Sequence, residues 1–80
     1  MTIHNAKLVS KQYSLEANLS SERGREYFLV QPTTADITLT LGGGNGSLVI
    51  PLGSYYEPYI PPTTSIDIVS TGDFVVVTNV

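Results

Sequence analysis

The chain has 80 residues and a formal net charge of −3, with four lysines and arginines, one histidine and no cysteine. That length fits one domain with a small core, the missing cysteines exclude disulfides and thiolate metal sites, and four basic groups are too few for nucleic-acid binding. No apolar run approaches the roughly 18 residues of a membrane span and no signal-peptide pattern is present, so we expect no membrane partner and a cytoplasm-like compartment.

The amino-terminal third predicts two strands. Residues 13–19 alternate apolar and polar side chains, which would place on one strand face Tyr13, Leu15, Ala17 and Leu19. A helix is the alternative because leucine, glutamate and alanine favour helices, but the period of two fits better. Residues 25–31 form the second strand, which Pro32 ends because proline cannot donate to a ladder. Residues 2–9 could add a strand, or residues 1–10 could be a docking arm.

Two further strands flank a glycine-rich run. Residues 36–41 alternate again, with the threonines on the outer face. Residues 42–46 predict a flexible hairpin loop, because the helix and lysine that phosphate-binding loops need do not follow them. Residues 47–52 return as a strand whose inward side chains would be Leu48, Ile50 and Leu52. Pro51 within this segment indicates an edge or bulged strand.

The carboxyl-terminal part combines an irregular connection with two strands. Residues 53–62 break all periodicity, residues 65–70 predict a strand, and a turn at residues 71–73 leads to a last strand at residues 74–78. The continuous valines of that strand imply burial on both faces. The count is six strands, or seven with the amino-terminal one. We therefore predict that residues 1–80 form a single all-β domain, a small antiparallel β-sandwich or barrel.

No residue pattern predicts catalysis. His4 has no predictable partner, and no G-x-S-x-G sequence marks a nucleophilic serine. Asp67 and Asp73 could meet across the predicted hairpin as an acid–base pair, although keeping the turn soluble is the simpler role for them. We therefore expect a non-enzymatic protein without a cofactor or a metal site.

The segment with recognition character is rich in tyrosine and proline. Its candidate interface residues are Tyr55, Tyr56, Pro58, Tyr59 and Ile60. Tyrosine supplies a large rigid contact area with a hydrogen-bonding tip, so it is enriched in interfaces. An equally weighted alternative is that these rings cap the open end of the barrel. A sugar platform ranks lower because the chain has no tryptophan.

Positive charge is confined to the first 25 residues. The chain has no lysine or arginine after Arg25, whereas residues 26–80 carry five carboxylates. The candidate cationic contacts are Lys7, Lys11, Arg23 and Arg25. We expect them to face either the acidic surface of another copy or the acidic shell of a larger particle. Small chains without disulfides are commonly stabilised by oligomerisation, so we expect a homo-oligomer or many copies in one assembly.

Two segments carry a resemblance of style, LTLGGGNGSLVIPLG and YYEPYIPPTTSIDIVSTGDFVVVTNV. Over residues 36–80 the chain resembles the small all-β virion structural proteins of tailed bacteriophages, in particular capsid decoration or cement proteins. The resemblance implies a structural protein of the virion, assembled in the host cytoplasm. Its partners would be its own copies and a major capsid or tail protein. The alternative is a β-sandwich module that binds carbohydrate or a cell-surface partner through the tyrosines.

Overall fold

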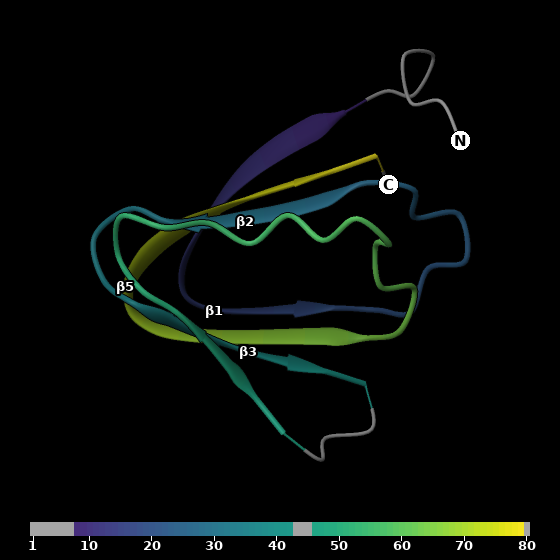
Figure 1. The fold of residues 1–80 in the computed structure, drawn as a ribbon. Helices are drawn as coiled ribbons and strands as arrows, with labels where there is room; N and C mark the ends of the chain where they lie inside the picture. Colours follow the sequence, from purple (N-terminus) through teal and green to yellow (C-terminus); the bar gives the residue numbers. More distant parts are fainter. Residues whose placement is uncertain (1–7, 43–45, 80) are drawn as a thin grey trace.

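The chain folds into five antiparallel strands, which confirms the all-β prediction (Figure 1). The structure is a computed structural model that describes residues 8–42 and 46–79, and those residues contain no helix. The strands are β1 (Val9–Leu19), β2 (Phe28–Pro32), β3 (Ile37–Leu41), β4 (Leu48–Ile50) and β5 (Ile66–Thr78). His4 and most of the predicted docking arm at residues 1–10 lie outside the described residues, as does the centre of the glycine loop.

Strand β5 is the centre of the fold. Along one side it pairs with β1 from one end to the other. Along the other side its second half pairs with β2 and its first half with β3, which in turn pairs with β4. Figure 1 shows β1 and β5 curving together, so that β2 and β3 come to lie in opposite layers. The single sheet thus folds over its own apolar face, as a small sandwich requires.

The turn predicted at residues 71–73 is wrong, because β5 runs through it as one strand of 13 residues. Gly72 makes the bend possible: a Cβ there would lie 2.2 Å from Thr34 Oγ1 and 3.0 Å from Ala35 Cβ. Asp73 N donates to Thr34 Oγ1 at 2.7 Å, which fixes the bend to the loop before β3. Asp67 and Asp73 therefore lie along one strand instead of facing each other across a hairpin. The strand count falls to five for the same reason.

A bulge in β1 corrects a second prediction. The β1–β5 register shifts between Ser14 and Glu16, and Leu15 has a φ of 68°. Its side chain is exposed, whereas Ala17 is buried and Tyr13 and Leu19 pack against the core as predicted. Bulges bend strands and increase their twist, so the extra residue lets β1 follow the curve of β5.

The core lies between the two layers. Its buried residues are Ala17, Phe28, Val30, Ile37, Leu39, Ile50, Ile66, Ile68, Phe74 and Val76. Strand β4 contributes only Ile50, since Leu48 and Leu52 are exposed, contrary to prediction. Pro51 follows directly after β4 and ends it, and β4 pairs only with β3, so the predicted edge position is confirmed.

Candidate functional site

Residues 53–62, here called the tyrosine loop, connect the two layers and are anchored at Tyr56. Backbone hydrogen bonds join Tyr56 N to Val30 O at 2.9 Å and Val30 N to Tyr56 O at 3.0 Å, which adds one bridge to the free edge of β2. The Tyr56 ring packs edge-on against Phe28, with centroids 6.3 Å apart. Tyr56 therefore acts as the barrel cap that was one of the two alternatives for the loop.

A second anchor joins the loop to the segment before β2. The Tyr27 hydroxyl donates a hydrogen bond to the Glu57 carboxylate. This bond, together with burial and the charge of Glu57, raises the pKa of Tyr27 to about 12. Pro58 is half-buried immediately after this contact. The middle of the loop is thus held at consecutive positions, and its conformation does not depend on a partner.

Arg25 is buried, so the prediction of an exposed contact cation is wrong for this residue. Only 5% of it is exposed, and its guanidinium donates to three backbone carbonyls, those of Ser20 at 2.9 Å, Pro62 at 2.8 Å and Thr64 at 3.0 Å. Burial lowers the pKa of Arg25, and the nearby Glu22 carboxylate opposes that shift. Its planar, multiply donating group fits this task better than an ammonium would. Arg25 thereby fastens the end of the tyrosine loop to the turn before β2.

The exposed side chains of the loop are Tyr55, Tyr59 and Ile60. Tyr59 is 98% exposed and Ile60 is 79% exposed, although both are large hydrophobic side chains. Tyr55 is 61% exposed. The predicted set therefore divides: Tyr56 and Pro58 hold the loop, while the other three present their side chains to solvent. We call Tyr55, Tyr59 and Ile60 the exposed trio.

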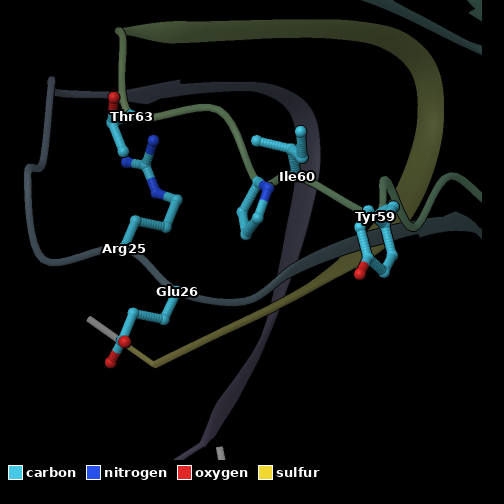
Figure 2. Close-up of a pocket in the computed structure, with 6 residues that line it drawn as sticks. Arg25, Glu26, Tyr59, Ile60 and Thr63 are labelled. Atoms are coloured by element: carbon cyan, nitrogen blue, oxygen red, sulfur yellow. The ribbon is translucent and has the colours of Figure 1, made fainter. Parts of the chain in front are cut away.

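A cleft of about 410 Å³ lies beside Tyr59 (Figure 2). Its lining residues are Arg25, Glu26, Tyr59, Ile60, Pro61 and Thr63. Figure 2 shows Tyr59 at one end of the cleft, Arg25 and Glu26 at the other, and Ile60 between them. Glu26, Pro61 and Thr63 were not among the predicted site residues, because long-range contacts bring the turn before β2 next to the end of the tyrosine loop: those of Arg25 and the hydrogen bond from Glu22 N to Thr63 O.

Of the other predicted cations, Lys11 lies apart from this surface. Lys11 is on β1 with its Nζ 5.1 Å from the Tyr13 ring centroid, and both β5 and β2 separate β1 from Tyr56. Arg23 is exposed in the turn before β2. Lys7 lies outside the described residues. Among the described residues, the structure therefore separates Lys11 from the tyrosines.

The part of the chain that the structure describes contains no group of three or more histidine, cysteine, aspartate or glutamate side chains arranged to hold a metal ion. A second cleft, of about 510 Å³, is lined by Ala35, Asp36, Thr38, Val69, Ser70 and Thr71. The Asp36 carboxylate beside it accepts a hydrogen bond from Leu52 N at 2.7 Å. Residues 8–42 and 46–79 contain no helix of the length and apolar character needed to cross a membrane.

No family model matches the sequence, and no curated protein matches it. Among solved structures, the chain is similar to the crystal structure of protein NMB1881 from Neisseria meningitidis. The sequences are 16% identical over 91% of this chain and 78% of that chain, with a TM-score of 0.49. A likeness at this level carries no argument about function, which has to be inferred from the surface described above.

Proposed function

We propose that this chain is a non-enzymatic structural protein that assembles on a larger particle through the exposed trio. A virion is the particle we propose, with the chain as a capsid decoration or cement protein or another head or tail component. The observation that carries the proposal is the exposure of Tyr59 and Ile60, at 98% and 79%, on a loop that is anchored on both sides. Rigid aromatic and aliphatic side chains at the surface are the usual anchors of protein interfaces.

The anchoring supports binding energetically. A contact surface that is already ordered loses little conformational entropy on association. Tyr56, the Tyr27–Glu57 hydrogen bond and the Arg25 contacts hold the loop in the free protein. Full burial of each large side chain contributes about 1.5–3 kcal/mol, so the exposed trio offsets part of the cost of association and the rest of the contact has to come from its surroundings.

Sedimentation of the tagged chain from its native source tests this proposal. We expect the wild type to sediment with a large particle, and a Tyr55→Ser/Tyr59→Ser variant to remain near the top of the gradient with an unchanged circular dichroism spectrum. Val49→Ser, an exposed position on β4, is the matched control and should sediment with the particle. A wild-type chain that stays near the top, or a double variant that still sediments with the particle, would contradict the proposal.

A carbohydrate-binding module is the second candidate, favoured by the cleft itself. An exposed tyrosine ring can stack on a sugar, and Glu26 and Thr63 place a carboxylate and a hydroxyl in the same cleft. Glycan-array screening of the wild type and Tyr59→Ser tests this candidate. Binding of a glycan by the wild type and its loss in Tyr59→Ser would favour the module over particle assembly.

A further inference from the structure

Tyr59 forms a protrusion directly beside a hollow. The ring is almost entirely exposed, while the cleft next to it has Tyr59 itself at one end and Arg25 and Glu26 at the other (Figure 2). A protrusion and a hollow side by side on one patch are what a two-fold symmetric interface needs, because the same patch must serve as donor and acceptor. A surface of this kind can complement itself.

We propose that two copies of the chain pair through this patch, each inserting its Tyr59 ring into the cleft of the other. The inference rests on the proposed function, since it names a second copy as the immediate partner of the exposed trio. Paired copies would then be the unit that attaches to the particle.

The chemistry of the cleft fits a tyrosine side chain. Ile60 and Pro61 offer apolar contact to the ring. A tyrosine hydroxyl needs a hydrogen-bond acceptor when it is buried, and the Glu26 carboxylate at the rim has no side-chain partner among the described residues. The three hydrogen bonds of the Arg25 guanidinium all go to backbone carbonyls and none goes to Glu26. Each Tyr59 hydroxyl would donate to Glu26 of the other copy, as Tyr27 does to Glu57 within one chain.

The expected interface is small. A specific interface buries at least about 1,200 Å² in total, or about 600 Å² per copy, which is roughly an eighth of the 5036 Å² surface of this chain. The exposed trio and the lining of the cleft are the surface that this pairing would bury. We therefore expect a reversible dimer with a dissociation constant in the range of about 1–100 μM, as is common for interfaces at the lower end of this size class.

Sedimentation equilibrium of the purified full chain measures this pairing. Tyr59→Ser removes both inserted rings and should weaken dimerisation more than about 100-fold. Glu26→Gln keeps the shape but replaces a charged acceptor with a neutral one, and should weaken it about threefold to tenfold. Val49→Ser is the control and should dimerise like the wild type.

Complementation between two variants provides the decisive measurement. Thr63→Arg fills the cleft at an exposed position and leaves the Tyr59 ring intact, whereas Tyr59→Ser removes the ring but keeps the other five residues that line the cleft. Neither variant should dimerise alone, but an equimolar mixture should form a heterodimer held by one inserted ring. If the two variants remain monomeric when mixed, the reciprocal insertion of Tyr59 is wrong.

Failure of the pairing can be told apart from failure of the proposed function. A wild-type chain that is monomeric at 1 mM overturns the pairing, and so does a Tyr59→Ser variant that dimerises as well as the wild type. If such a monomer still sediments with its particle and Tyr59→Ser does not, the proposed function stands and the cleft is occupied by a different protein.

Discussion

The guanidinium of Arg25 donates to the carbonyl of Pro62 at 2.8 Å, across 37 residues of chain. Two more carbonyls accept from the same group, and none of its partners is a carboxylate. The charge is therefore held by backbone dipoles, and its removal would leave three carbonyl acceptors without their donor in a partly buried site.

We expect Arg25→Ala to lower the free energy of unfolding by about 2–4 kcal/mol, because buried acceptors left unpaired are costly. Arg25→Lys should recover only part of that loss, since one ammonium cannot reproduce the planar fork. Urea denaturation of both variants measures these values. Arg23→Ala, at an exposed position two residues earlier, is the control and should stay within about 0.5 kcal/mol of the wild type.

Gly72→Ala should destabilise the fold by about 2 kcal/mol or more. The new methyl group would meet Thr34 Oγ1 at 2.2 Å and Ala35 N at 3.2 Å, so backbone as well as side chain would have to move. Thermal unfolding measures the loss. Gly46→Ala is the matched control, because a Cβ there meets nothing within 4 Å. An unchanged melting temperature for Gly72→Ala would show that the bend of β5 tolerates a side chain.

The alternating segments could be predicted from the sequence because each strand has one face in the core. Residues 36–41 illustrate this, since Ile37 and Leu39 are buried and Thr38 is exposed. The alternation says nothing about a strand that continues through a bend. A Thr-Gly-Asp triplet is typical of turns, and only the close approach of Thr34 shows that Gly72 serves a bend within β5 instead.

The candidate site could be predicted only in part. The tyrosines marked the loop, but which rings point inward depends on the bridge between Tyr56 and Val30, a pairing of residues far apart in the chain. Arginine is usually a surface residue, so the sequence suggests exposure for Arg25. The carbonyls of Pro62 and Thr64 that accept its hydrogen bonds lie 37 and 39 residues further along the chain. Long-range backbone contacts of this kind leave no local pattern.

Leu15→Gly should raise stability by about 0.5–1 kcal/mol, unlike most glycine substitutions in strands. Leu15 has a φ of 68° and an exposed side chain, so glycine relieves backbone strain and loses little burial. Urea denaturation measures the gain. Gln12→Gly, at an exposed position of the regular part of β1, should instead lower stability by about 0.5–1 kcal/mol. An equal loss of stability in the two variants would contradict the claim that the backbone is strained at Leu15.

Stability should fall between about pH 10 and pH 12 through Tyr27. Its pKa is raised from 10.0 to about 12 by the hydrogen bond to Glu57, so the unfolded chain releases this proton first and the contribution is fully present only below about pH 10. Tyr27 is half-buried, and solvent screening reduces the expected effect to about 1 kcal/mol. Urea denaturation at pH 8 and pH 11 should show Tyr27→Phe less stable than the wild type at pH 8, with about half of that difference remaining at pH 11, midway between the two pKa values. Tyr59→Phe is the control and should follow the wild type at both values.

Tyr56→Ser and Tyr55→Ser should differ sharply although the residues are neighbours. Tyr56 packs against Phe28 and its ring closes the core, so its truncation should cost about 3 kcal/mol of unfolding free energy. Tyr55 is 61% exposed, and Tyr55→Ser should change stability by less than about 0.5 kcal/mol. Urea denaturation of the two variants side by side measures this difference. If Tyr55→Ser also unfolded the chain, the loop would be a cap throughout and the exposed trio would not be free to bind a partner. A stable Tyr55→Ser variant that no longer associates would assign the loss to the contact surface alone.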